Sequence, residues 1–479
     1  MQIVPCPSCG AQLQFRSPAS VMAVCEYCQT TVLKDADSVK DLGKMSALLE
    51  DYSPLQIGSS GIFGGNAFTV IGRIQLRYAE GMWNEWYLLF NDGKPAWLGD
   101  ASGQYMLTTE IQNDDQIPAF TDLIPARSYA IHGQRYMAAD VRTADCIGGQ
   151  GELPFKVGTG WQAKVADFRS GRNFLTLDYS DPAQTKIFAG QAVTLDEMQC
   201  QLLREDDQIQ AGSSKFKGKV APLLCPSCGS SCAFLPGVTS TLLCPSCHAQ
   251  VDTTGSTAQV LAAGKSVAQV YTTLQLGAEA NISGRPFQII GLMKCVDNEN
   301  TIWTEYLLHS PRAGFLWLIE TEHSWARASV LDEWPSWIQE DTATLSGTAF
   351  HKLYRYPARV IFAIGAFNWR VNVGYQTEVV EFQSGQNTLA AEMTAAEITW
   401  SQSTPVNADQ IHAWFGDKIV VSKSAEAVPL KTASIKYCIL LFLLNLIPLV
   451  HSEDALIYVV IGCVAIYYPA KYLDSLNEE

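Results

Sequence analysis

Eight cysteines, arranged as two groups of four, are the residues of this sequence best placed to bind metal ions. Each group has the form C-x2-C-x15-C-x2-C and opens with the knuckle Cys-Pro-Ser-Cys-Gly. Two such thiolate pairs can surround one tetrahedral ion, which leaves no position open for water or substrate. We therefore expect two structural Zn²⁺ ions, one held by Cys6, Cys9, Cys25 and Cys28, the other by Cys225, Cys228, Cys244 and Cys247.

Two further candidate ligands lie in the second group. Cys232 falls between its two cysteine pairs, and His248 follows Cys247 directly. The first group has Leu13 and Gln29 at the corresponding positions. Because four matched thiolates already fill a tetrahedral zinc shell, neither Cys232 nor His248 is expected to bind the ion.

Signatures of catalysis are absent from the sequence. The seven histidines are scattered, and no H-E-x-x-H or G-x-S-x-G motif occurs. The glycine-rich stretch 58–65 matches no phosphate-binding fingerprint and reads better as a turn. The protein is therefore predicted not to be an enzyme, and an activity hidden in its β-rich parts is the alternative.

The cysteine groups belong to a long internal repeat. A displacement of 219 carries Cys6 onto Cys225, and it also carries the segment 68–72 onto 287–291. Further along, 168–173 reappears as 382–387. A repeat of this length predicts tandem domains. We expect zinc ribbon 1 at 1–35, β-rich domain 1 at 36–203, a polar linker at 204–222, zinc ribbon 2 at 223–254 and β-rich domain 2 at 255–428.

Most of the chain has the pattern of antiparallel strands. Aromatic and β-branched residues alternate with polar ones, and turn signals such as Asn91-Asp92-Gly93 separate them. The predicted fold is mainly β, and each large domain is barrel-like or sandwich-like. One short amphipathic helix is expected over 36–51, where apolar residues recur at intervals of three and four.

The charge of the chain disfavours nucleic acid as a partner. The formal net charge is −15, and the segment 223–254 contains no Lys or Arg. Neutralisation of phosphates by Lys and Arg supplies most non-specific affinity for nucleic acids. A nucleic-acid-binding zinc-ribbon protein is therefore the third alternative, and it requires a basic stripe that the linear sequence does not show.

An aromatic and acidic strand motif occurs once in each half, as Trp83-x-Glu85-Trp86 and as Trp303-x-Glu305. Strand alternation places Trp83 and Glu85 on one face and Trp86 on the other, so both acids are expected to be partly buried. One interpretation is an aromatic-lined pocket whose carboxylate holds a small cation such as a polyamine. The favoured one is a structural acid, hydrogen-bonded to the backbone or to Arg73 or Arg77.

These motifs resemble a known family. The segments Phe68 to Arg73, Gly81 to Leu88 and Gly93 to Leu98 are similar to the bacterial family catalogued as domain of unknown function 4178. The resemblance covers both halves, and it implies β-rich domains with zinc ribbons and, by association, a link to polyamines or envelope stress. The second copy has Tyr306 and Leu292 in place of Trp86 and Arg73, which favours the first copy for any ligand-binding role.

The C-terminus holds two apolar runs, 437–450 and 455–468. As helices over 432–452 and 455–473 they would be about 31 and about 28 Å long, close to the hydrocarbon thickness of a membrane. We therefore predict an α-helical hairpin at 432–473 that anchors the chain to the membrane. The alternatives are a re-entrant loop or a helical pair packed on the other domains. Lys431, Lys436 and Lys471 flank the runs, which places both ends in the cytosol.

Together these features predict a membrane-anchored zinc-ribbon adaptor or sensor. It would lie at the bacterial inner membrane with its N-terminal domains and C-terminus in the cytoplasm. It would act by binding a protein partner or a small ligand on the cytosolic face.

Overall fold

The computed structural model describes residues 2–17, 19–34, 39–44, 53–78, 81–101, 103–112, 117–157, 160–204, 223–232, 241–252, 259–262, 272–310, 313–338, 341–416, 430–445 and 454–477. The chain divides into two units, Met1–Ile419 and Val420–Glu479. The first unit is built from strands and the second from helices, which confirms the predicted fold class. Most of the predicted linker, 205–222, lies outside the described residues.

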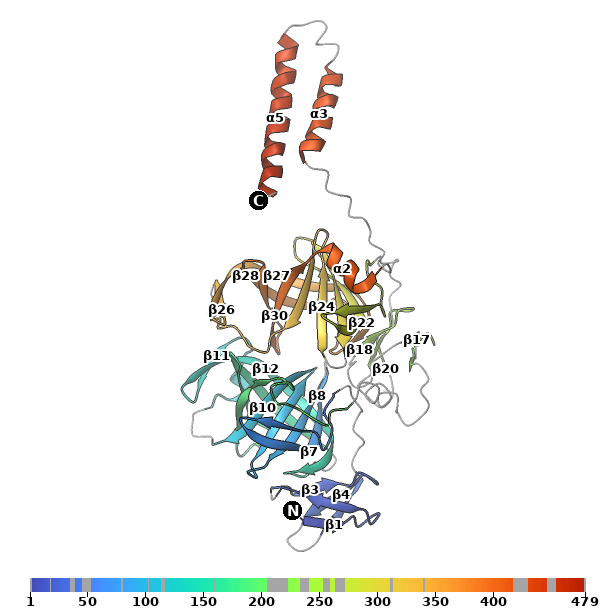
Figure 1. Cartoon of the computed structure of the whole chain (residues 1–479), viewed down its shortest axis with the longest axis vertical. Coiled ribbons are helices and arrows are strands. Elements are labelled where there is room, and N and C mark those ends of the chain that lie inside the picture. Colours follow the sequence, from blue (N-terminus) through green and yellow to red (C-terminus); the bar gives the residue numbers. More distant parts are fainter. Residues whose placement is uncertain are drawn as a thin grey trace. The chain divides into compact units, whose positions relative to one another are not determined.

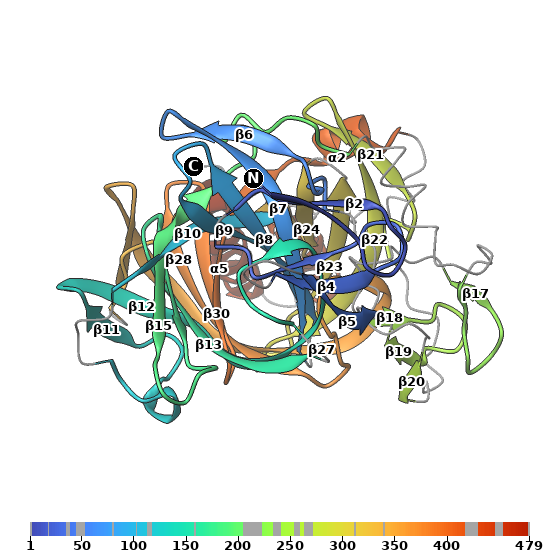
Figure 2. The same ribbon diagram turned by 90° about the horizontal axis from the view of Figure 1, so that it is seen from below.

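The first half of unit 1 contains a closed antiparallel barrel (Figures 1 and 2). Its strands follow one another in the order β12-β13-β14-β15-β10-β9-β8-β7, and β12 pairs back with β7. The strands are β7 (Asn66–Arg77), β8 (Met82–Phe90), β9 (Pro95–Ala101), β10 (Gln104–Ile111), β12 (Gln134–Leu153), β13 (Trp161–Ser170), β14 (Asn173–Asp178) and β15 (Lys186–Val193); β6 (Ser60–Phe63), η1 (Phe120–Asp122) and β11 (Ser128–Ile131) flank them.

The second half repeats this topology. The order is β27-β28-β29-β30-β25-β24-β23-β22, and β27 pairs back with β22. The strands are β22 (Arg285–Val296), β23 (Ile302–Ser310), β24 (Gly314–Glu320), β25 (Trp325–Val330), β27 (Thr348–Phe367), β28 (Gln376–Ser384), β29 (Asn387–Met393) and β30 (Ile398–Val406), with β21 (Glu279–Ile282), β26 (Thr342–Leu345) and helix α2 (Ala408–Phe415) beside them.

Two glycines close each barrel. Gly72 of β7 pairs with Gly151 of β12, and Gly291 of β22 pairs with Gly365 of β27. Gly151 and Gly365 have φ values of +67° and +91°, which only glycine adopts readily. A Cβ at Gly151 would lie 2.2 Å from the Ile71 carbonyl oxygen, and one at Gly365 would lie 2.4 Å from that of Ile290. Close backbone approach at the closure therefore depends on these glycines.

The first cysteine group lies on a small ribbon that continues the barrel sheet. The ribbon consists of β1 (Gln2–Pro5), β2 (Gln12–Phe15), β3 (Met22–Val24), β4 (Thr30–Lys34) and β5 (Val39–Lys44). Strand β3 pairs with β12 over Gly151 to Leu153, beginning at the closing glycine itself. The carboxylate of Glu152 fixes the connection, because its Oε2 accepts hydrogen bonds from the Arg16 N, the Ser17 N and the Ser20 Oγ.

The second ribbon is attached in the same way. It contains β16 (Leu223–Leu224), β17 (Ser231–Cys232), β18 (Thr241–Leu243), β19 (Gln250–Asp252) and β20 (Gln259–Ala262), and β18 pairs with β27 over Gly365 to Phe367. In both halves the last three strands of the ribbon therefore continue the barrel sheet, whereas β1 with β2 and β16 with β17 form separate two-stranded sheets.

The helix predicted over 36–51 is wrong for the described part of that segment. Residues 39–44 form strand β5, which pairs with β4. The free edge of β4 supplies backbone partners to an extended segment, and this tertiary pairing outweighs a short helical periodicity.

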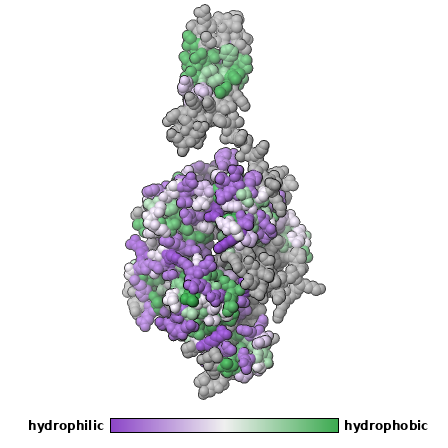
Figure 3. Space-filling view, viewed as in Figure 1, coloured by the Kyte–Doolittle hydropathy of each residue, from purple (hydrophilic) through white to green (hydrophobic). Residues whose placement is uncertain are grey.

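Unit 2 contains the predicted helical hairpin, with α3 (Leu430–Leu444) and α5 (Asp454–Asn477). The helices approach closely at Gly462, where a Cβ would lie 2.8 Å from the Leu441 side chain. Many of their apolar side chains are exposed, among them Leu444 and Tyr458, and these helices stand out as hydrophobic in the space-filling view (Figure 3). Among the described residues, no helix combines the length and apolar character needed to cross a membrane, so the predicted membrane-spanning hairpin is not supported.

Candidate metal centres and barrel interiors

The two cysteine groups form compact four-sulfur sites, as predicted. In the first, Cys6 Sγ lies 3.6 Å from Cys28 Sγ, and Cys9 Sγ lies 3.6 Å from Cys25 Sγ. The corresponding distances in the second are 3.7 Å. An ion bound tetrahedrally at a Zn–S distance of about 2.3 Å separates its sulfurs by about 3.8 Å. The eight predicted cysteines therefore have the spacing that such an ion requires.

Backbone turns position the sulfurs. Gly10 and Gly229 follow the first knuckle of each group with φ values of +78° and +75°, and each donates its N–H to the carbonyl of the first cysteine, at 2.8 Å. Gln29 and His248 adopt the same left-handed conformation after the second knuckle. Cys232 and His248 belong to neither four-sulfur group. His248 thus has the place that Gln29 has in the first ribbon, which is a turn position.

The strand motif brings each predicted acid to a neighbouring indole. Trp83 Nε1 donates to Glu85 Oε1 at 2.8 Å, and Trp303 Nε1 donates to Glu305 Oε1 at 2.6 Å. Opposite Glu85 lies Gly99 of β9, whose absent side chain makes room: a Cβ there would lie 3.5 Å from both carboxylate oxygens. Burial raises the pKa of Glu85 to about 8, and nearby acids including Asp167 add to this rise. Burial also raises the pKa of Glu305.

Trp86 and Arg73 lie on the opposite face of the sheet from Glu85. Arg73 donates from Nε and Nη2 to the Asn84 Oδ1 at 3.0 and 2.7 Å, and its guanidinium lies 4.7 Å from the centre of the Trp86 ring. Strand alternation explains this separation. Of the two structural partners suggested from the sequence, Arg73 is therefore directed away from Glu85, and the indole of Trp83 is the donor instead.

Two more carboxyls share the interior face of each barrel, and the sequence reading missed them. In the first barrel they are Asp167 of β13 and Asp178 of β14. A displacement of 214, the one that relates 168–173 to 382–387, carries them onto Glu381 of β28 and Glu392 of β29. Each barrel thus contains three acids at equivalent positions. Comparing the charged positions of the two copies in this register would have found them.

The pairing of strands places the acids of a barrel on the same face of its sheet. In the second barrel Glu305 pairs with Ile319, Glu392 pairs with Val379, and Val379 pairs with Tyr356, and paired residues share a face. Tyr356 Oη donates to Glu381 Oε1 at 2.6 Å.

Water reaches these carboxyls although protein surrounds them. Glu85, Asp167 and Glu381 are half-buried, and Glu392 keeps an exposed side chain. The dense surroundings still raise the pKa of Glu392 to about 8, through burial first and then through Glu305 and Glu381. Among the described residues, only the cysteine groups bring three or more potential ligand atoms within 4.8 Å of one another. The acids of one barrel are therefore not arranged around a single metal ion.

Comparison with known proteins gives one result. The family described as a domain of unknown function, DUF4178, matches residues 56–195 and 275–408, which is more than half of the chain. The two matches coincide with the two barrels and confirm the resemblance seen in the strand motifs. No curated protein and no solved structure matches.

Proposed function

The chain belongs to the DUF4178 family, with two copies of the domain in tandem, and from this premise we propose that it is a binding protein, an adaptor or sensor, whose two zinc ions stabilise its barrels. The observation that carries the proposal is the pair of closed four-sulfur sites on ribbons that continue the barrel sheets. A closed thiolate shell gives no open coordination position, so the metal contributes folding energy instead of catalysis.

Each ribbon depends on its ion more than on its own core. The first ribbon's own buried cluster is small, with Cys6, Leu13, Cys25 and Val32, and its Met22 and Val24 pack into a barrel cluster instead. A segment of this size cannot build a sufficient hydrophobic core without a metal or crosslink. Because β3 and β18 extend the barrel sheets, loss of the ion should also loosen β12 and β27.

Metal analysis of the purified full chain tests the zinc assignment. We expect two zinc ions per chain, and Cys25→Ser and Cys244→Ser should each reduce the content to one. Cys232→Ser is the matched control, because this buried thiol lies beside the second group but outside it. One zinc ion or none in the unaltered chain, or equal loss in the Cys232→Ser variant, would contradict the assignment.

The barrel interiors favour a second candidate function, the binding of a small organic cation. Each interior combines three carboxyls with a tryptophan, a combination that attracts cations by charge and by cation–π contact. The acids are not gathered around one point, which suits an extended cation with several charges, such as a polyamine, better than a metal ion. The two interiors would then act as equivalent sites.

Calorimetric titration with spermidine near pH 9 tests this second candidate, because the raised pKa of Glu85, about 8, leaves this carboxyl mostly uncharged in neutral solution. Glu85→Gln with Glu305→Gln should weaken binding at least about tenfold, because each change removes one charged contact. Glu279→Gln, an exposed acid on β21, is the control and should bind as the unaltered chain does. Equal affinity in all three proteins would exclude the barrel interiors as the site. Attachment to a membrane, a cytoplasmic location and a protein partner stay predictions.

A further inference from the structure

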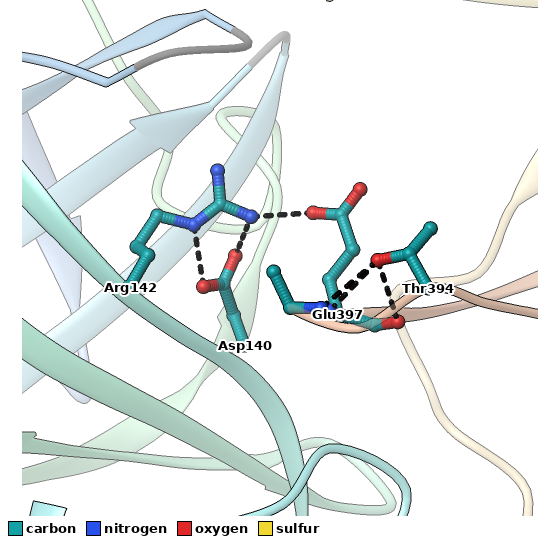
Figure 4. A network of polar contacts seen from close by, with 5 residues as sticks. Asp140, Arg142, Thr394 and Glu397 are labelled. Atoms are coloured by element: carbon teal, nitrogen blue, oxygen red, sulfur yellow. Dashed lines mark hydrogen bonds and ion pairs between the residues drawn. The ribbon is translucent and has the colours of Figure 1, made fainter. Parts of the chain in front are cut away.

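The two barrels of unit 1 contact each other through a turn and a strand edge. The turn Thr394–Glu397, between β29 and β30, lies along β12 of the first barrel (Figure 4). Val141 N donates to Ala396 O at 2.9 Å, and Asp140 and Glu397 form an antiparallel bridge. Glu397 Oε2 also accepts from Arg142 Nη2 at 2.5 Å. The turn therefore supplies a backbone acceptor for the N–H of Val141 and a carboxylate for the guanidinium of Arg142.

Hydrogen bonds within the turn hold its shape. Thr394 N donates to Glu397 O at 2.8 Å, and Thr394 Oγ1 accepts from Glu397 N at 3.1 Å (Figure 4). The strand edge is free to receive it because β12 pairs with β7 only from Gly148 to Gly151. An unpaired strand edge offers a row of backbone donors and acceptors to another segment.

Apolar residues extend the contact. Met137 and Ala139 of the first barrel belong to one buried cluster with Trp334 and Trp337 of the second. Trp334 N donates to Gly171 O at 3.0 Å. In the first barrel, both faces of the β12 edge are consequently covered.

This contact is heterologous, because it joins the edge of one copy to the turn of the other. Such an interface leaves an unused edge at one end and an unused turn at the other. A displacement of 214 carries Ala139, Asp140 and Val141 onto Leu353, Tyr354 and Arg355 of β27. Strand β27 pairs with β22 only from Arg359 onward, so its preceding segment has the same unpaired edge.

The edge of β27 is open where that of β12 is covered. Leu353 is 42% exposed and Tyr354 is 59% exposed, whereas Ala139 is 7% exposed. In the described part of the chain, no turn forms a backbone hydrogen bond or bridge with this segment comparable to that of Ala396 with Val141. Leu353 and Tyr354 thus lie exposed at a β-bulge on the unpaired edge of β27, whose other edge pairs with β28.

The unused turn lies in the first barrel. Residues 179–185 join β14 to β15, as Thr394–Glu397 joins β29 to β30. Its tip is exposed and carries the acid Asp181, and the turn is three residues longer than Thr394–Glu397. Lys352 and Arg355 flank the open edge of β27, where they pair with the partly or fully exposed acids Asp341 and Glu378 of the same barrel. A turn with an acid can therefore meet a strand edge with basic neighbours, as it does inside the chain.

We propose that the β27 edge around Leu353 and Tyr354 binds the β14–β15 turn of a second copy of this chain, so that chains associate head to tail. The contact uses the same strand edge and the same inter-strand turn as the one between the two barrels of a single chain, with Lys352 and Arg355 as the nearby cations because Tyr356 stands in the place of Arg142. Each chain contributes one open edge and one open turn, and association can continue beyond a pair.

Sedimentation velocity of the full chain over a range of concentrations tests this association. A mild non-ionic detergent covers the exposed apolar side chains of α3 and α5. The mass of the unaltered chain should rise with concentration. Leu353→Glu should weaken association at least about tenfold, because it places a charge at the centre of the contact. Asp181→Lys should act in the same direction. Ile302→Glu, at a residue 51% exposed in the same barrel, is the control and should leave association unchanged.

Mixing the two variants gives the sharper result. The Leu353→Glu chain keeps an intact turn and the Asp181→Lys chain keeps an intact edge. An equimolar mixture should form pairs although neither variant does so alone. A monomeric unaltered chain at every concentration, association that both variants leave intact, or a mixture that stays monomeric would overturn the proposal.

Discussion

The first barrel holds its interior acids beside arginines, whereas the second does not. Arg142 and Arg169 occupy the positions of Tyr356 and Gln383 in the second barrel. Arg142 pairs with Asp140 and lies 4.0 Å from the centre of the Tyr78 ring. Burial lowers the pKa of Arg169 to about 10. The closing glycines, the Trp–Glu pairs and the three acids are nevertheless the same in both copies.

This difference bears on the role of the acids. A carboxyl kept only as half of a structural ion pair would change when its partner changes. Asp140, the acid that pairs with Arg142, is indeed replaced by Tyr354, whereas Glu305, Glu381 and Glu392 keep the other three acids of the first barrel. The retained acids are therefore better explained by a task common to both interiors than by one particular ion pair.

The largest expected effect concerns a feature that the two copies share. Gly151→Ala and Gly365→Ala should each lower the stability of their own barrel by about 4 kcal/mol, because each adds a clash with a carbonyl to an unfavourable positive φ. Hydrogen-exchange mass spectrometry, resolved by barrel, measures the loss. Gly133→Ala is the control, since its φ is also positive but a Cβ there meets nothing within 4 Å. A similar loss at Gly133 would assign the effect to backbone strain alone.

A smaller effect is expected where the copies differ. Arg142→Gln leaves the partly buried Asp140 without its counter-charge and should cost about 3 kcal/mol. Tyr356→Phe removes only the hydrogen bond to Glu381 and should cost about 1 kcal/mol. The same barrel-resolved exchange compares them. Equal costs would mean that the arginine has no special importance in the first barrel.

The smallest effect is a dependence on pH that both barrels should share. The pKa of Glu85 is raised from 4.5 to about 8, so the folded barrel binds this proton more tightly than the unfolded chain. The resulting stability is complete below about 4.5 and is lost as pH rises through about 8. Glu85→Gln should make the stability of the first barrel less dependent on pH. Glu392→Gln, at a residue whose pKa is also raised to about 8, should do the same in the second barrel.

Thermal unfolding measured between pH 5 and pH 8 records this dependence of stability on pH. The lower limit, pH 5, lies above the pKa of Glu85 in the unfolded chain, and pH 8 lies near its pKa in the folded protein. Glu110→Gln, an exposed acid at the end of β10, serves as the control. Stability that rises with pH in the unaltered chain would show that the interior acids are ionised in the folded protein, which contradicts the raised pKa values.

Much of the fold could be predicted from local patterns. The cysteine spacing identified the metal groups, the repeat identified two units, and the alternation around Trp83 and Glu85 predicted which side chains share a face. These features depend on neighbours in the sequence, where strand geometry fixes direction. The helix predicted over 36–51 was wrong because pairing with another strand outweighs local periodicity there. The described part of this segment, 39–44, is a strand that pairs with β4.

Residue spacing and periodicity are enough to identify the eight candidate ligands, the duplication and the strand-rich character. The three-dimensional pairing of strands was needed to show that the sheets close at paired glycines, that Asp167 and Asp178 join Glu85 on one interior face, and that Glu397 reaches Arg142 from the other barrel. The physical reason is that alternation directs a side chain to a face, whereas the pairing of strands distant in sequence decides which faces meet.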